Sequence, residues 1–438
     1  MENIRSVKNA AWIIACKIVQ SVLGLIIGMI SARYLGPSNY GIINYAASVV
    51  AFVVPITQLG LRSTLVQEII NAPKKEGRIL GSALVFEMAA SLLGMVGVTA
   101  FAMIVNRTEK DTIIVCALYS ISLFFQATEL TQYWFQAKLL SKYTSLTMLS
   151  AYIIVSAYKI YLLVSEKSVH WFAISQALDY ALISVILLII YKKIADQKLS
   201  FSFKLGMEML SKSKYFIISG LMVVIFAQTD KIMIKLMIDN TAEGYYSAAV
   251  ACASMTSFVF TAIIDSMRPM IFEAKKESEL LFQRRVSELY SIIIYFAFAQ
   301  CLVISVFSKL MIRILYGAAY LPAAPSLSIV VWYTTFSYIG SVRNIWLLAQ
   351  DLQKYLWRIN LAGAVANIIL NFLLIPSMGI IGAAIASLVT QFFTNVVIGF
   401  IFKPLRPNNS LMMKGLDPRL MVAEVKQLSV ILRRKKKS

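Results

Sequence analysis

A run of 44 residues without a charged side chain, residues 359–402, constrains this chain more than any other feature. A transmembrane helix needs about 20 apolar residues, so the run is too long for a single crossing. Pro376, Ser377, Met378 and Gly379 divide it near the middle, where proline and glycine interrupt a helix. The run therefore predicts a hairpin of two membrane-spanning helices.

The composition of the whole chain agrees with a membrane protein. Hydrophobic residues make up 59% of the 438 residues, and the mean hydropathy is +0.72. Charged residues make up 15%, against roughly 25% in soluble domains, which is too few to cover several water-exposed domains. The sequence therefore predicts an all-α, polytopic membrane protein. In such a protein the net charge of +20 indicates basic cytoplasmic segments rather than nucleic-acid binding.

Twelve segments are long and apolar enough to be spans, within a range of ten to fourteen that reflects the charges of Lys159 and Asp179 inside two of them. They are residues 10–33, 42–60, 81–105, 112–136, 143–165, 169–191, 215–237, 244–268, 290–312, 323–350, 356–375 and 379–402. We expect a lobe of six helices in residues 1–191 and a second in residues 215–402. A basic linker, 192–214, would join the lobes, and a basic tail, 403–438, would follow them.

The basic residues outside these spans predict the orientation. With the N-terminus inside, inner segments hold 30 of the 42 lysine and arginine residues, and outer segments hold 6. Because basic segments are retained on the cytoplasmic side, we expect both termini and the linker in the cytoplasm.

The tail has a pattern of its own. Asp417 and Pro418 resemble the start of a helix, and Met421, Val425 and Leu428 follow at helical spacing. An amphipathic helix on an anionic inner leaflet fits this pattern, and a disordered basic tail is the alternative.

A short repeat relates the two predicted lobes. Residues 35–41 follow the first span, residues 238–244 follow the seventh, and Gly41 aligns with Gly244. Both copies join an outgoing helix to a returning one in the same orientation. Parallel repeats of this kind are found in transporters whose substrate site lies between the two halves.

Several motifs, in order along the chain, resemble those of Wzx-type polysaccharide flippases. These flippases belong to the multidrug/oligosaccharidyl-lipid/polysaccharide (MOP) exporter superfamily. The motifs are residues 32–41 (ARYLGPSNYG), 59–61 (LGL), 229–231 (TDK), 243–249 (EGYYSAA), 315–320 (LYGAAY) with 324–325 (AP), 367–371 (NIILN) and 374–384 (LIPSMGIIGAA).

The resemblance implies a fold and a function. The fold would be two six-helix lobes, V-shaped around a central cavity that opens to one side at a time. The function would be to move an oligosaccharide on an undecaprenyl pyrophosphate carrier across the bacterial cytoplasmic (inner) membrane, for O-antigen, lipopolysaccharide or another surface polysaccharide. Membrane lipids, a coupling ion (proton or sodium) and the polysaccharide polymerase machinery are the other partners that it implies.

Charged residues inside the spans are functional candidates, since an ionisable group in a membrane is costly unless it faces protein or water. The residues concerned are Lys17, Glu87, Glu129, Lys159, Asp179, Asp230, Lys231, Lys235, Asp265, Arg268 and Arg343. We expect Lys17, Lys231 and Arg343 to line the cavity and to attract the pyrophosphate, with Lys17 and Arg343 near its inner mouth. Arg268, Asp230 and Asp179 are further candidates.

Structural alternatives remain open for each of these residues. The cations can instead pair with Glu87, Glu129 or Asp179 and hold helices together. Lys159 and Lys235 are expected to extend toward the outer interface, as long basic side chains do near helix ends.

Catalysis is not expected. The chain has no GxxxxGK[ST] phosphate loop and no GxSxG motif, a single histidine, His170, and four dispersed cysteines. The sequence therefore predicts a transporter that is not an enzyme, with no cofactor and no metal site. The alternative is a cation-coupled multidrug antiporter of the same superfamily, whose cavity should be acidic.

Overall fold

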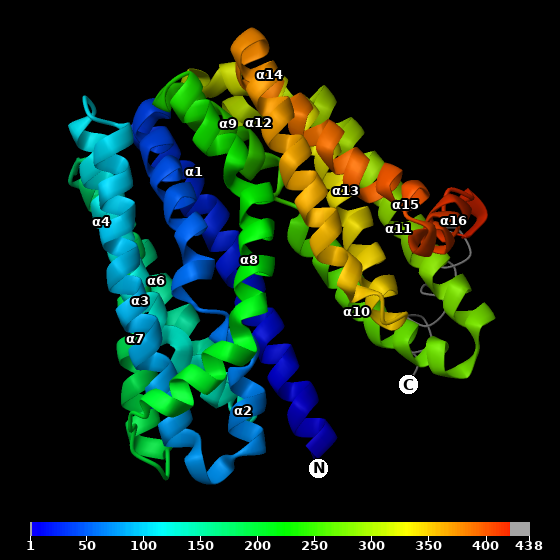
Figure 1. The fold of residues 1–438 in the computed structure, drawn as a ribbon. Coiled ribbons are helices and arrows are strands. Elements are labelled where there is room, and N and C mark those ends of the chain that lie inside the picture. The colour runs from blue at the N-terminus through cyan, green and yellow to red at the C-terminus, as the bar shows by residue number, and fades with distance from the viewer. Residues whose placement is uncertain (1, 421–438) are drawn as a thin grey trace, which may run out of the picture. The chain divides into compact units, whose positions relative to one another are not determined.

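The computed structural model describes the backbone of residues 2–420, with the side chains of residue 16 and of residues 19–420. Every regular element in this part is a helix, and no strand is present (Figure 1). The longer helices are α1 (Glu2–Thr57), α3 (Glu76–Val105), α4 (Lys110–Thr128), α6 (Ser141–Val164), α7 (Val169–Ile194), α8 (Phe203–Met237), α10 (Ser257–Glu277), α11 (Glu279–Val306), α13 (Ala324–Ala349) and α14 (Leu356–Phe392). The shorter helices are α2 (Leu65–Asn71), α5 (Gln132–Ala137), α9 (Asn240–Ala253), α12 (Ser308–Leu315), α15 (Ile398–Ile401) and α16 (Arg406–Lys414). The expected tail helix begins at Asp417 and Pro418: residues 418–420 are helical, and from residue 421 onward the tail lies outside the described residues.

The chain forms two compact units, residues 1–244 and residues 245–438. The first unit contains α1 to α8 and the start of α9, and the second contains the rest of α9 and α10 to α16. Because α8 packs along α1 and α3, it belongs to the first unit. The predicted lobes, 1–191 and 215–402, divide the chain at another point, before α8, and they remain a prediction.

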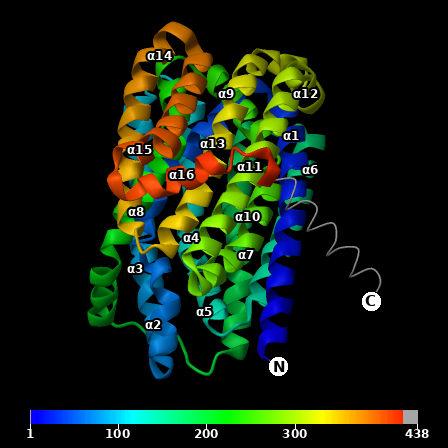
Figure 2. The same cartoon turned by 90° about the vertical axis from the view of Figure 1, so that its right-hand side faces the viewer.

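Two of the long helices are each broken at a glycine. Gly36, with φ 70° and ψ 170°, interrupts α1, and Gly379, with φ 61° and ψ −139°, interrupts α14. Glycine has no Cβ and adopts positive φ at little cost, and Pro37 then starts the second half of α1 with its preset φ. Figure 2 shows the chain turning back on itself at the break in α14. The hairpin predicted within residues 359–402 is therefore confirmed.

The described helices account for the predicted spans. Eight are long and apolar enough to cross a membrane, or nine if α9 and α10, bent by 43°, form one span. The breaks at Gly36 and Gly379 divide two of these into pairs, and α13 covers the predicted span 323–350. Each of the twelve predicted spans thus overlaps a helix. Large apolar side chains such as Leu93 (75% exposed) and Val164 (79%) point outward, as expected of a surface that faces lipid.

Each unit has its own apolar interior. In the first unit one core surrounds Tyr45 and Leu123, and another surrounds Leu65 and Trp134. In the second unit a single core surrounds Phe282 and Trp346.

The predicted linker packs against the first unit. The Ser200 amide donates to the Gly77 carbonyl at 3.2 Å, and the Ser202 amide donates to the Ser82 hydroxyl at 2.9 Å. From Phe203 onward the linker residues already belong to α8. The segment 195–202 is therefore a connection fixed on the start of α3.

The two glycines of the predicted repeat, Gly41 and Gly244, lie at a close contact between the two repeated segments. A Cβ on Gly41 would collide with the Asn240 carbonyl and lie 2.9 Å from the Gly244 nitrogen. A Cβ on Gly244 would collide with the Pro37 carbonyl and lie 3.1 Å from the Gly41 nitrogen. The contact is thus reciprocal, as expected where two equivalent segments meet, and it requires a residue without a side chain at both positions.

Candidate functional site

Arg62 forms the centre of a buried charge cluster in the first unit. It lies on the short 3₁₀ helix Leu61–Ser63, which follows two residues of positive φ, Leu59 (53°) and Gly60 (66°). Gly60 also packs directly against the Ser213 carbonyl of α8. This tight turn ends α1 and directs the Arg62 side chain between the helices.

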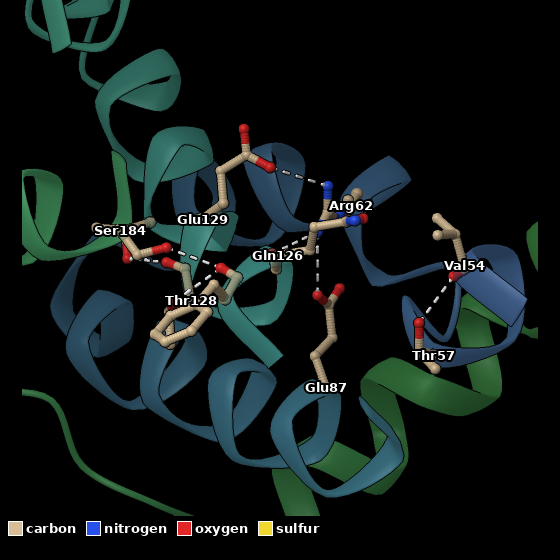
Figure 3. Close-up of polar contacts among 10 residues, drawn as sticks. Val54, Thr57, Arg62, Glu87, Gln126, Thr128, Glu129 and Ser184 are labelled. Atoms are coloured by element: carbon tan, nitrogen blue, oxygen red, sulfur yellow. Dashed lines mark hydrogen bonds and ion pairs between the residues drawn. The ribbon is translucent and has the colours of Figure 1, made fainter. Parts of the chain in front are cut away.

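Two carboxylates flank the Arg62 guanidinium (Figure 3). Nη2 lies 3.6 Å from Glu87 Oε2, and Nη1 lies 3.6 Å from Glu129 Oε2. Nη2 also donates to the Gln126 carbonyl at 2.6 Å. Glu87 is 1% exposed and Glu129 is 7% exposed, so water does not screen these charges. The phenol of Tyr133 interacts with the same guanidinium.

The Arg62 cluster (Arg62, Glu87 and Glu129) holds one cation and two acids. Burying a carboxylate without a partner costs several kcal/mol, and here both acids share one arginine. A proton or small cation bound by one carboxylate would leave Arg62 paired with the other. Chemically, the cluster can therefore hold helices together or exchange a cation.

Lys235 forms a second cluster, near the connection between α3 and α4. Its Nζ donates to Asn106 Oδ1 and, at 3.1 Å, to Glu109 Oε1, and it lies 5.0 Å from the centre of the Tyr45 ring. Glu109 also accepts a hydrogen bond of 2.9 Å from Asn240 Nδ2. The cluster thus ties α8 and the start of α9 to the α3–α4 connection. Lys235 is 5% exposed and is buried against these partners of the α3–α4 connection, and its expected place near the outer interface stays a prediction.

Glu109 has a pKa below its ordinary value of 4.5. Partial burial raises this pKa, but hydrogen bonds from Asn240, Thr112 and Lys235, together with the charge of Lys235, outweigh the effect of burial. The carboxylate is therefore stabilised in its charged form.

Arg343 is buried in the second unit, with 5% of its surface exposed. Its Nη1 donates to the Thr394 carbonyl at 2.7 Å, inside the single π-helical turn Phe393–Val397, and its Nη2 donates to Asn344 Oδ1 at 3.2 Å. Its Nε has no hydrogen-bond partner, and no carboxylate lies within 4.0 Å, among the described residues. The hydrogen-bond partners described for this guanidinium are thus neutral carbonyl and amide oxygens, and no described carboxylate offsets its charge.

The other predicted site residues form none of the ion pairs of these clusters, although the charge of Asp179 acts on Glu129. Asp230 (8% exposed) and the half-buried Lys231 lie on α8, and Asp179 lies on α7 with its Oδ1 buried. Arg268, in the second unit, is half exposed and pairs with Asp265 at 3.0 Å. The side chain of Lys17, on α1, lies outside the described residues.

Sequence reasoning missed Arg62 and Glu109, because both were assigned to segments outside the spans. The signal for Arg62 was present, since two acids inside spans, Glu87 and Glu129, require a cation nearby. Lys17, Lys231 and Arg343 were considered as partners only in the structural alternative, whereas Arg62 is the partner that the structure describes. No group of three or more metal-binding side chains occurs within the described range.

Comparison with solved structures defines the class of fold. An inward-facing multidrug-resistance MATE-family transporter of the MOP superfamily superimposes with a TM-score of 0.69 at 12% identity, over 90% of this chain and 96% of that one. The lipid II flippase MurJ, inward closed, gives 0.69 at 15% identity, over 94% and 92%. A eukaryotic MATE transporter gives 0.63 at 16% identity, over 94% and 99%. The all-α fold is that of the MOP superfamily, as the sequence predicts.

Comparison of sequences defines the family. The model of the polysaccharide biosynthesis protein family matches residues 6–275, and the chain belongs to this family. An uncharacterized membrane protein of Methanocaldococcus jannaschii is 29% identical over 229 residues, which are 49% of this chain and 45% of that protein. The chain thus spans about half the length of this curated relative. The resemblance found in the motifs is confirmed, and the protein is a multi-pass membrane protein of this family.

Proposed function

We propose that this protein is a flippase for an oligosaccharide linked to undecaprenyl pyrophosphate, which it moves from the inner to the outer leaflet of the cytoplasmic membrane. The observation that carries the proposal is the family match over residues 6–275, which covers the first unit from residue 6 onward. The glycan would be used for a surface polysaccharide such as O-antigen, and the polymerase machinery would receive it. Both termini would face the cytoplasm, and the two lobes would give alternating access.

Arg343 supports an anionic substrate. A pyrophosphate needs a cation that is not already neutralised, and no carboxylate pairs with Arg343 among the described residues. The buried guanidinium attracts an anion more strongly than an exposed one does, because the surrounding dielectric is low. Lys231 and Lys17 would add positive charge at other depths in the membrane. Asp230, Asp179 and Arg268 are further candidates for lining the cavity.

The Arg62 cluster favours a second function, a cation-coupled multidrug antiporter. Its acids outnumber its cation, so it offers a negative group that a proton, a sodium ion or a cationic drug can use. In the flippase the same cluster would bind the coupling ion. Substrate charge separates the two functions, because a flippase moves an anion and an antiporter moves a cationic drug.

Complementation of a bacterial strain that lacks its polysaccharide flippase tests the proposal in cells. We expect the unmodified protein to restore surface polysaccharide and Arg343→Gln to restore less, because the cation is lost. Arg313→Gln, which neutralises an exposed arginine at the end of α12, is the matched control and should complement normally. Failure to restore polysaccharide, together with increased resistance to cationic dyes, would favour the antiporter.

A further inference from the structure

A polar pocket lies within the first unit, among α1, α5 and the start of α6. Its volume is about 300 Å³, at the lower end of the range of about 300–1,000 Å³ for small-molecule sites. Six of its lining residues carry amides or hydroxyls: Gln20, Gln132, Gln136, Ser141, Thr144 and Ser145. None of the described lining residues is charged.

Thr144 is a lining residue whose hydroxyl has no partner among the described atoms. This residue is 8% exposed, and its Oγ1 is buried. Leaving a buried hydroxyl unpaired costs about 1–3 kcal/mol, so a partner inside the pocket would be stabilising. Ser145, on the same face of α6, already donates to the Ser141 carbonyl at 3.0 Å and keeps its acceptor capacity.

The lining chemistry selects a neutral, hydroxyl-rich ligand. Each glutamine amide offers two donors and one acceptor oxygen, and each hydroxyl offers both roles, which matches the hydroxyl groups of a sugar. An anion would require a cation, and none of the described lining residues supplies one. An apolar chain would leave the polar lining unpaired.

The pocket is also connected to the Arg62 cluster. Gln132, which lines the pocket, lies one helical turn after Glu129 and interacts with its carboxylate, and Glu129 pairs with Arg62. The connection between α5 and α6, beside the pocket, belongs to the segment that the basic-residue pattern places in the cytoplasm. A substrate that arrives from the cytoplasm would therefore meet the pocket early.

We propose that this pocket binds a sugar residue of the transported glycan, separately from the cations that attract the pyrophosphate. The proposal rests on the proposed function, since it assigns the glycan end of the same substrate. A sugar in the pocket would pair Thr144 Oγ1 and compete with Glu129 for Gln132. Glycan binding would thereby alter the Arg62 cluster.

Cys16 provides a reporter for this pocket, because it is one of the lining residues. The other three cysteines, Cys116, Cys252 and Cys301, are buried and free and line none of the described pockets, so each can be replaced by alanine. Alkylation of Cys16 by N-ethylmaleimide is then measured in nanodiscs. Ser145→Phe, which fills the pocket, should slow the reaction and would confirm that the reagent enters there.

Three probes that share an octyl chain and differ in their head group test the class of ligand: octyl glucoside, octyl phosphate and octanol. We expect octyl glucoside alone to protect Cys16, with the rate falling about threefold at twice its Kd. Thr144→Val should raise the Kd for octyl glucoside about two- to tenfold, as the loss of one hydrogen bond predicts. Thr147→Val, the same change at a buried residue of α6 that does not line the pocket, is the control. Gln136→Leu gives a second test at an exposed position if Thr144→Val folds poorly.

Other outcomes overturn the proposal. Equal protection by all three probes would indicate that the pocket binds the octyl chain. Protection by octyl phosphate alone would indicate an anion site. No protection would indicate a pocket filled with water. Flipping of a lipid-linked oligosaccharide by the unmodified protein is measured in parallel. Flipping without protection would refute the pocket alone, whereas protection without flipping would refute the proposed function and leave the sugar site.

Discussion

At the scale of single residues, Arg62 is the group on which two buried carboxylates depend. Arg62→Gln would leave Glu87 and Glu129 without a cation in the described part of the first unit, at a cost of about 3–5 kcal/mol. We expect a clear fall in the thermal unfolding temperature of the purified protein. Arg78→Gln, on the exposed side of α3, is the control and should have little effect.

A double variant separates charge pairing from packing. Glu87→Gln in the Arg62→Gln background removes one of the two unpaired charges, so we expect part of the lost stability to return. If Arg62→Gln unfolds at the same temperature as the unmodified protein, or if the double variant is no more stable than the single one, the Arg62 cluster does not hold the helices.

The lowered pKa of Glu109, on the α3–α4 connection, predicts that the stability of the fold depends on pH. A carboxyl whose folded pKa is lowered stabilises the fold above its unfolded pKa, and the contribution is lost as pH falls through the folded value. Stability should therefore decline as pH falls below about 4.5, and Glu109→Gln should flatten the profile in this window. Glu166→Gln, at an exposed acid, is the control, and identical profiles for all three proteins would contradict the prediction.

Sequence reasoning identifies which charges are exceptional at this scale, but not their partners. It found Glu87, Glu129 and Arg343 because charges are rare in apolar spans. It missed Arg62 because the turn at Leu59 and Gly60 brings a residue of a connecting segment into the interior. Pairing of this kind depends on tertiary contacts that periodicity does not contain.

At the scale of elements, the contact between Gly41 and Gly244 joins the second half of α1 to α9. Gly41→Ala or Gly244→Ala should destabilise the protein by about 1–3 kcal/mol, because the added Cβ collides with backbone that has no room to move. Gly28→Ala is the matched control, since its Cβ would have nothing within 4 Å. Unfolding temperatures equal to that of the control would show that the segments separate easily.

The helices themselves follow from local sequence. Long apolar runs, the Pro376–Gly379 break and the glycine before Pro37 predict the elements, because spans and breaks are local properties. The assignment of α8 to the first unit was not predicted, because it depends on packing along α1 and α3.

At the scale of the whole molecule, the distribution of basic residues predicts which side each connection faces. Single cysteines at Ser200 and Ser410, in a background whose four cysteines are replaced by alanine, test this orientation, because both positions are exposed. In intact cells neither should react with an impermeant thiol reagent, and both should react after the membrane is opened. Rapid labelling of either in intact cells would reverse the orientation.

The most direct measurement is transport by the purified protein in liposomes that contain a fluorescent undecaprenyl-pyrophosphate-linked oligosaccharide. The fraction of label that an impermeant quencher reaches over time reports movement between leaflets. With no ATP present, and with a proton or sodium gradient imposed, we expect this fraction to rise faster than in liposomes containing the Arg343→Gln variant. If the fraction matches protein-free liposomes under every gradient, while a cationic dye is transported, the protein is not a flippase for this substrate.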